Sequence, residues 1–357
     1  MSLPYTAPWL LAPMEGVTEP LFRGMVLGLH APEDLGGACT EFVRVSSSAL
    51  PRRVLRAHLG VQGPIPVALQ LMGSDLAHLA TTAARAVEVG APVLDLNFGC
   101  PAKGALRGCA GSALMDDPER LRELVAATCE AVAGRVPVTA KLRAGGDDDS
   151  RLEELVDAAC VGGAALVTMH ARTRAEAYSV DADWARLRRA ADAARAHGVP
   201  VCGNGGVERH ADLEALRRQT GCAYAMVGRG ALADPWIFSG HEASRAEAAG
   251  FLVAYGRGLE AQGVSTRGAA ARVKQLLGHW RAGGLVPDDE ARRGWLRERD
   301  PQALLARLEA CIPRGGDVAR GGDLARGGNV AQSGDSARSG DLPHASAPAG
   351  TSTGREG

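Results

Sequence analysis

The chain has 357 residues, which is enough for one large domain and a smaller one. Apolar residues make up 46% of it but aromatic residues only 4%, so Ala, Val and Leu must build most of the core. The formal net charge of −1 gives no global excess of positive charge that would indicate nucleic acid, although a local basic patch is compatible with it. We find no charged-then-apolar leader and no long apolar span, and therefore expect a soluble cytoplasmic protein without a membrane partner.

Eight short apolar runs predict eight β-strands. Each run is continuously apolar, which is typical of strands that are covered on both faces. The runs are Trp9–Ala12, Ala38–Phe42, Val67–Leu71, Val93–Asn97, Val138–Leu142, Leu166–His170, Val199–Gly203 and Ala223–Val227. Eight strand–helix units in about 230 residues predict a (β/α)8 barrel, the TIM barrel of the α/β class. A doubly wound sheet is the alternative, but no Gly-x-Gly-x-x-Gly fingerprint follows the first strand.

The segments between and after these runs carry helix signals. Asp75–Val89 has apolar residues at helical spacing, and Asp117-Pro118 is a helix start. After Asp234-Pro235 the strand pattern stops, and three Ala-, Leu- and Arg-rich segments predict a small C-terminal all-helical domain. These segments are Glu242–Gln262, Gly268–Arg281 and Asp288–Cys311.

From Pro313 onward the sequence is a six-residue repeat that begins RGGDVA and RGGDLA. The arginines and acids of this repeat balance, and it has little apolar surface to bury, so we expect a low-complexity, disordered tail without assigning it a function. The predicted organisation is a barrel domain over residues 1–240, a helical domain over 241–312 and the tail over 313–357.

Cysteine and lysine usage narrows the chemistry. None of the eight cysteines forms a Cys-x-x-Cys pair or lies near a His at ligand spacing, so we expect no metal site. Most of them lie in apolar runs, as buried thiols of a reducing compartment do. Only three of the 40 basic residues are lysines, Lys103, Lys141 and Lys274. In so Arg-rich a chain, each is a candidate for a position that needs a compact, tunable ammonium.

Polar residues gather at the carboxyl ends of the predicted strands, where a barrel places its functional groups. In chain order they are Pro13-Met14-Glu15, Arg44, Gln70, Asn97 with Cys100, Lys141 with Arg143, His170 with Arg172, Asn204-Gly205-Gly206 and Gly228-Arg229. The last two groups are glycine-rich turns before helices, and with Arg229 they predict a phosphate cradle, unless the glycines only turn the chain.

A ring-binding site is indicated beside this cradle. Gln70 offers a donor and an acceptor to a heterocycle, and Lys141 offers positive charge to an anionic ring. His170 could support the ring or the phosphate, or be a satisfied core histidine. These features fit FMN, and pyridoxal phosphate is the weaker alternative.

Nine motifs in order resemble the tRNA-dihydrouridine synthase family. They are APMEGVT, TEFVRV, QLMG, DLNFGCPAKG, GSALM, AKLR, HARTR, CGNGGV and MVGRGAL, and the resemblance covers about Leu10 to Ile312. APMEG with TEFVRV, and ARVKQLL at Ala271–Leu277, look most like the bacterial C subfamily. That subfamily commonly has an acidic residue where Gly206 stands and a cysteine where Phe98 stands, which are departures of this chain.

The resemblance implies an FMN-dependent oxidoreductase that uses NADPH, or NADH, to reduce the C5–C6 double bond of a uridine in tRNA, uridine 16 of the D-loop. It implies Cys100 as the catalytic proton donor. It implies FMN contacts from Pro13, Met14, Glu15, Gln70, Lys141, His170, Asn204, Gly205, Gly206, Gly228 and Arg229. A thiol with an ordinary pKa of about 8.5 is protonated at neutral pH, as a proton donor must be.

The tRNA partner is expected to contact both domains. Asn97 is predicted to face the base, Arg44, Arg143, Arg172 and Tyr178 to lie on loops at the pocket mouth, and Lys103 to lie on a mobile lid. Arg272, Lys274, His279 and Arg281 have nearly helical spacing and predict a basic face on the helical domain. The alternatives are a barrel flavoenzyme acting on a free pyrimidine, as dihydroorotate dehydrogenases do, and a non-catalytic tRNA-binding protein. We expect a monomer, and expect Cys109, on the loop after Cys100, to be a plain thiol.

Overall fold

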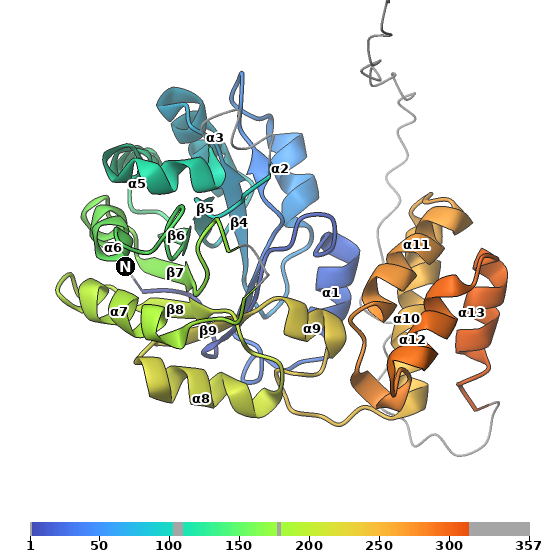
Figure 1. Cartoon of the computed structure of the whole chain (residues 1–357). Helices are drawn as coiled ribbons and strands as arrows, with labels where there is room; N and C mark the ends of the chain where they lie inside the picture. The colour runs from blue at the N-terminus through green and yellow to red at the C-terminus, as the bar shows by residue number, and fades with distance from the viewer. Residues whose placement is uncertain (1, 103–109, 177–179, 314–357) are drawn as a thin grey trace, which may run out of the picture. The chain divides into compact units, whose positions relative to one another are not determined.

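The computed structural model describes residues 2–102, 110–176 and 180–313 (Figure 1). Its sheet contains only parallel pairs, in the order β2-β1-β9-β8-β7-β6-β5-β4-β3, and a further pairing of β2 with β4 closes it. The strands are β1 (Trp9–Leu11), β2 (Gly37–Cys39), β3 (Val43–Arg44), β4 (Val67–Met72), β5 (Leu94–Asn97), β6 (Val138–Arg143), β7 (Leu166–His170), β8 (Val201–Asn204) and β9 (Tyr224–Val227). Eight of them form the closed ring and β3 extends the end of β4, so the predicted TIM barrel is confirmed.

The predicted strand Ala38–Phe42 is too long. The chain leaves the ladder after Cys39 and pairs again with β4 only at β3, where Val43 lies opposite Leu71. Between the two strands the Glu41 carboxylate turns to the loop after β1, where it accepts hydrogen bonds from the backbone N–H groups of Gly16 and Val17. Thr40, Glu41 and Phe42 therefore form a short connection between β2 and β3 and are not part of a continuous strand.

Helices surround the barrel strands, as Figure 1 shows. They are α1 (Pro20–Gly28), α2 (Arg52–Leu59), α3 (Leu76–Glu88), α5 (Pro118–Val132), α6 (Leu152–Val161), α7 (Trp184–Arg195), α8 (His210–Thr220) and the short α9 (Arg229–Ala233). Both predicted helix starts are confirmed, since the Asp75 and Asp117 carboxylates accept from the backbone N–H groups of His78 and Arg120. All six residues of β4 are buried, as its continuous apolar run predicts.

The C-terminal helices are α10 (Arg245–Ala261), α11 (Thr266–Leu277), α12 (Asp289–Arg297) and α13 (Pro301–Glu309). The prediction of one helix over Asp288–Cys311 is wrong, because Pro301 forces the preceding residue out of the helical region. Asp300 instead caps α13 by accepting from the Gln302 N–H at 2.9 Å. The predicted helix Gly268–Arg281 is also too long, since α11 ends before Gly278.

The barrel and the C-terminal helices pack against each other through α1. The Phe22 ring lies edge-on to Phe251 and Tyr255 of α10, with centroids 6.1 and 5.8 Å apart. Glu19, at the start of α1, accepts from the Tyr255 hydroxyl and from Arg272 of α11, both at 2.8 Å. The domain boundaries at residues 240 and 312 stay predictions. Among the described residues, none of the helices has the length and apolar character needed to cross a membrane.

Candidate active site

The carboxyl ends of the strands surround a cavity of about 820 Å³. It is lined by most of the site residues predicted from the strand ends, namely Pro13, Met14, Glu15, Gln70, Asn97, Cys100, Lys141, Arg143, His170, Arg172, Asn204, Gly205, Gly206, Gly228 and Arg229, and also by His279 and Arg281. Arg44, Arg272 and Lys274 do not line it. Lys103, Tyr178 and Cys109 lie outside the described residues.

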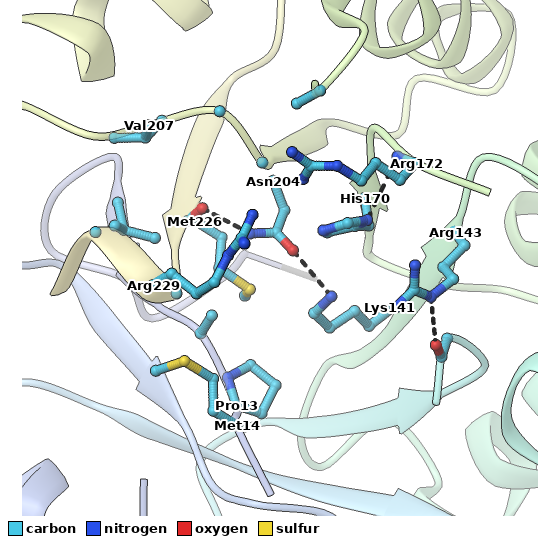
Figure 2. A pocket seen from close by; sticks show the side chains of 18 of the residues that line it. Pro13, Met14, Lys141, Arg143, His170, Arg172, Asn204, Val207, Met226 and Arg229 are labelled. Carbon is cyan, nitrogen blue, oxygen red and sulfur yellow. Dashed lines mark hydrogen bonds between the residues drawn. The ribbon is translucent and has the colours of Figure 1, made fainter. Parts of the chain in front are cut away.

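Lys141 of β6 places its ammonium inside this cavity. Its Nζ donates to Asn204 Oδ1 at 3.1 Å, and Asn204 Nδ2 donates to the Met226 carbonyl at 2.8 Å, so the two side chains orient each other (Figure 2). Burial lowers the pKa of Lys141 to about 8, the Arg143 charge adds to this, and Asp95 opposes it. Lys141 is therefore a cation at neutral pH that can lose its proton under mildly basic conditions.

His170 is a buried, neutral imidazole at the end of β7. Burial lowers its pKa well below the ordinary value, and the charges of Lys141, Arg143 and Arg172 lower it further. The backbone N–H of Arg172 donates to His170 Nδ1 at 3.4 Å. The ring proton then lies on Nε2, so His170 lines the cavity as a hydrogen-bond donor without positive charge.

The two glycine turns provide a backbone surface that side chains would fill. Gly205 and Gly206 have φ angles of +115° and +76°, and a Cβ at Gly206 would lie 2.9 Å from the Trp184 Nε1 atom. A Cβ at Gly230 would lie 2.6 Å from the Val207 carbonyl oxygen, so the two turns pack directly on each other. Only glycine allows this approach, and Arg229 adds a guanidinium to the same wall of the cavity. The donor set suits a phosphate group.

A tight turn after β5 carries Cys100. Asn97 Oδ1 accepts from the backbone N–H groups of Gly99 at 3.0 Å and Cys100 at 2.9 Å, and Arg143 Nε donates to the Gly99 carbonyl at 2.7 Å. Gly111 packs against the turn, since a Cβ there would lie 2.7 Å from the Cys100 carbonyl oxygen. Burial raises the pKa of the Cys100 thiol, so it is protonated at neutral pH.

The arginines predicted to lie on loops have other positions. Arg44 belongs to β3 and Arg143 to β6. Arg143 is buried, and its guanidinium donates to the Gly99 and Thr173 carbonyls, while Arg172 is buried and donates to the Val180 carbonyl. The loop prediction for Arg44 and Arg143 is wrong because the strand carries on past the apolar run into these polar residues. A guanidinium has several N–H donors, so each of these buried arginines can hold a loop in place by donating to its backbone carbonyl groups.

The four basic residues predicted to share one helix face are divided. Arg272 pairs with Glu19 of the barrel, and Lys274 Nζ donates to the Leu296 and Glu298 carbonyls at the end of α12. His279 and Arg281 follow the end of α11 and line the cavity. The prediction of a single basic face is therefore wrong, because Gly278 ends the helix before the last two residues.

Sequence reasoning missed three cavity or loop residues. Trp184, the first residue of α7, lines the cavity and donates from Nε1 to the Gly205 carbonyl at 3.0 Å. Glu208 accepts from Arg281 at the rim, and Glu41 holds the loop after β1. The sequence carries no signal that separates Trp184 from the other four tryptophans. The seven described cysteines are free thiols, and the described residues contain no cluster of three metal-ligating side chains.

A closed parallel barrel with a ligand-sized cavity at the strand ends defines the class of (β/α)8-barrel proteins. A family model described as dihydrouridine synthase matches residues 10–257. The chain therefore belongs to the dihydrouridine synthase family, which is a family of oxidoreductases, and the predicted resemblance is confirmed.

Similar proteins point to one branch of this family. The chain is 37% identical to a tRNA-dihydrouridine(16) synthase of Ralstonia nicotianae over 64% of this chain and 70% of that protein. It is 39% identical to the protein of the same name from Cupriavidus necator, over 64% of this chain and 71% of that protein. It is 38% identical to the protein of this name from Pseudomonas syringae pv. tomato, over 63% of this chain and 71% of that protein. These names agree with the C-subfamily resemblance.

Proposed function

We propose that this protein reduces the C5–C6 double bond of uridine 16 in the D-loop of tRNA, with FMN as its flavin and NADPH, or NADH, as the electron donor. Family membership and the names of the relatives support the substrate. The observation that carries the chemistry is a protonated thiol, Cys100, on the same cavity as the Lys141 ammonium and the two glycine turns.

The cavity residues fit FMN. The turns at Gly205–Gly206 and Gly228–Arg229 would take its single phosphate on backbone N–H groups and a guanidinium. Lys141 would lie against the ring, where an ammonium stabilises negative charge, and His170 would donate a hydrogen bond from Nε2. Pro13 and Met14 belong to the same cavity lining and supply apolar surface for a flavin ring (Figure 2). The chemistry that FMN would supply in this cavity is hydride transfer to C6 of the uracil ring.

Cys100 would complete the reduction by donating its proton to C5. A proton donor must be protonated at rest, and burial keeps the thiol in that state. The turn held by Asn97 and Arg143 sets the position of the thiol. A base of folded tRNA must leave its stack to reach such a cavity, and this step requires contacts at the mouth, for which Arg44, Lys103, Tyr178, His279 and Arg281 stay candidates.

The first test replaces the thiol. Cys100→Ala should retain flavin, seen in the visible spectrum, and lose uridine reduction by about 10²- to 10⁴-fold, the range for general acid catalysis. Cys129→Ala, in α5 and away from the cavity, is the matched control and should keep wild-type activity. Full activity of Cys100→Ala would mean that another group donates the proton to C5. A colourless wild-type protein that takes up no FMN would contradict the proposal that FMN is the cofactor.

The second test identifies the substrate. Mass-spectrometric mapping of dihydrouridine in tRNA from a deletion strain should show loss at position 16 and restoration by the intact gene. Loss at a different D-loop position would contradict the assignment to uridine 16 and leave the reaction type intact.

A further inference from the structure

We propose that Asp95 is a positioning residue, which orients the side-chain amides of Gln70 and Asn97 and through them holds the turn that carries Cys100. Its consequence for uridine reduction rests on the proposed function. The positioning itself follows from the geometry of β4, β5 and β6.

Asp95 lies in the barrel below the cavity floor. In the ladder it is the partner of Gln70 on β4 and of Thr139 on β6, so these three residues form one row across neighbouring strands. Asp95 is 4% exposed and is not among the cavity-lining residues, whereas Gln70, Asn97 and Cys100 are. Any effect of Asp95 on a ligand must therefore pass through another side chain.

A continuous chain of hydrogen bonds runs from this carboxylate to Cys100. Gln70 Nε2 donates to Asp95 Oδ2 at 2.7 Å, and Asn97 Nδ2 donates to Gln70 Oε1 at 2.8 Å. Asn97 Oδ1 then accepts from the backbone N–H groups of Gly99 and Cys100. The Thr139 hydroxyl donates to the other carboxylate oxygen but has no place in this chain.

The two ends of the chain allow only one direction for both amides. An ionised carboxylate only accepts, so Gln70 must turn its NH2 group to Asp95 and its oxygen to Asn97. Backbone N–H groups only donate, so Asn97 must turn its oxygen to the Cys100 turn and its NH2 group to Gln70. A neutral group in place of Asp95 would let Gln70 reverse, which would place two oxygens or two NH2 groups face to face at Asn97.

The energetics favour a functional reason for the acid. A buried carboxylate costs free energy that an apolar side chain of similar size would avoid. Here burial raises the pKa of Asp95 to about 6, while hydrogen bonds from Gln70 and Thr139 and the Lys141 charge oppose this shift and keep it ionised at neutral pH. With this polarity, one N–H of each amide is used within the chain, and both side chains belong to the cavity lining.

The test measures the Cys100 thiol directly. The rate of its alkylation by iodoacetamide, located by peptide mass spectrometry in the full-length protein, reports how firmly the turn is held. Asp95→Asn should raise this rate about five- to tenfold, the factor for a weakening by about one hydrogen bond, and Asn97→Ala, which removes both hydrogen bonds to the turn, should raise it at least as much. The double variant should match Asn97→Ala alone, because both substitutions break the same chain.

Thr139→Val is the matched control. It removes a hydrogen bond to the same carboxylate but leaves the chain to Cys100 intact. At about pH 8, where Asp95 stays ionised without this bond, the alkylation rate should equal that of the wild type at the same pH. Gln70→Met interrupts the chain without altering the acid and replaces Asp95→Asn if that variant does not fold. Three results would each overturn the proposal. The first is a wild-type alkylation rate in Asp95→Asn, or in Gln70→Met where that variant replaces it. The others are an increase in the double variant equal to the product of the two single increases, and an increase in Thr139→Val as large as that in Asp95→Asn.

The consequence for catalysis is measured separately. Single-turnover reduction of uridine should be slower in Asp95→Asn than in the wild type. The double variant should be as slow as Asn97→Ala alone, as in the alkylation series. If the wild-type protein reduces no uridine, the proposed function fails, and the alkylation series alone still decides whether Asp95 positions the Cys100 turn.

Discussion

Lys141 differs from the arginines that supply almost every other basic group of this chain. A guanidinium stays charged at any accessible pH, whereas a buried ammonium can be tuned. In the barrel, burial and the Arg143 charge bring the pKa of Lys141 to about 8. A ligand with negative charge on its ring therefore meets a cation whose charge depends on pH in a measurable range.

Flavin affinity should consequently fall as the pH rises through about 8. Below this value Lys141 is an ammonium that would donate charge-assisted hydrogen bonds to the acceptor atoms of a bound flavin ring, and above it the amine is neutral. The measurement is the dissociation constant of FMN from about pH 6.5 to about pH 9.5, a range that lies on both sides of the shifted pKa of Lys141. Lys141→Met should bind FMN more weakly and lose this dependence, and an equally steep fall in that variant would assign the titration to another group.

Gly206 should be intolerant of any side chain. Its φ of +76° is strained for other residues, and a Cβ would meet the Trp184 indole at 2.9 Å. Gly206→Ala should therefore cost about 1–3 kcal/mol in the free energy of unfolding, measured by urea denaturation.

Gly24→Ala is the control for that substitution. Gly24 lies in α1 with nothing within 4 Å of the added Cβ, so this variant should be as stable as wild type or more stable by about 0.5–1 kcal/mol. Equal stability of Gly206→Ala and wild type would show that Trp184 can move aside.

Site residues could be predicted where strand ends supply them. Gln70, Lys141 and His170 lie near the ends of recognisable apolar runs, and Asn204 follows one directly. Closure of the barrel alone brings them to one cavity. The partners of Arg143 could not be predicted, because Gly99 is 44 positions away and the bond depends on loop packing. Asp95 illustrates the same limit, since its place in a strand is readable but its hydrogen bonds are not.

At the scale of elements, caps and apolar spacing predicted the long helices well. Asp75 and Asp117 both begin their helices as N-caps. The two-residue strand β3 is too short to give a periodic signal, so its pairing with β4 could not be predicted from the sequence. Errors at α11, α12 and α13 arose because Ala- and Leu-rich sequence continues the helical pattern past Gly278 and up to Pro301.

The contact between α1 and the C-terminal helices should contribute measurable stability. Glu19 serves two donors, Tyr255 and Arg272, and its side chain is 17% exposed. Glu19→Ala should cost about 1–3 kcal/mol, because it leaves both partly buried donors without this acceptor. Glu309→Ala removes a more exposed ion pair with Arg257 and should cost less than about 1 kcal/mol. Similar losses in both variants would mean that the Glu19 cluster is no more than a surface pair.

At the scale of the whole molecule, the barrel follows from counting strand–helix units, and the family follows from the order of nine motifs. Neither the number of strand–helix units nor the order of the motifs predicts how the C-terminal helices contact the barrel. The rings that meet there, Phe22 with Phe251 and Tyr255, are far apart in the sequence. Only the structure shows which rings form this contact.

Removal of residues 313–357 should change neither the thermal midpoint nor uridine reduction. The repeat in this segment offers little apolar surface, so its deletion removes little that could stabilise the fold. The measurements are thermal unfolding and activity of a chain that ends at Ile312. A lower midpoint or lost activity would give the repeat a role that its composition does not predict.

Trp184 makes the cavity observable by light. The chain has five tryptophans, and Trp184 alone among them lines the cavity, with its indole N–H on the Gly205 carbonyl. An isoalloxazine ring absorbs where tryptophan emits, so a flavin seated there would quench this indole more strongly than the other four. Occupancy of the cavity could thus be followed by intrinsic fluorescence, and Trp184→Phe would provide the blank.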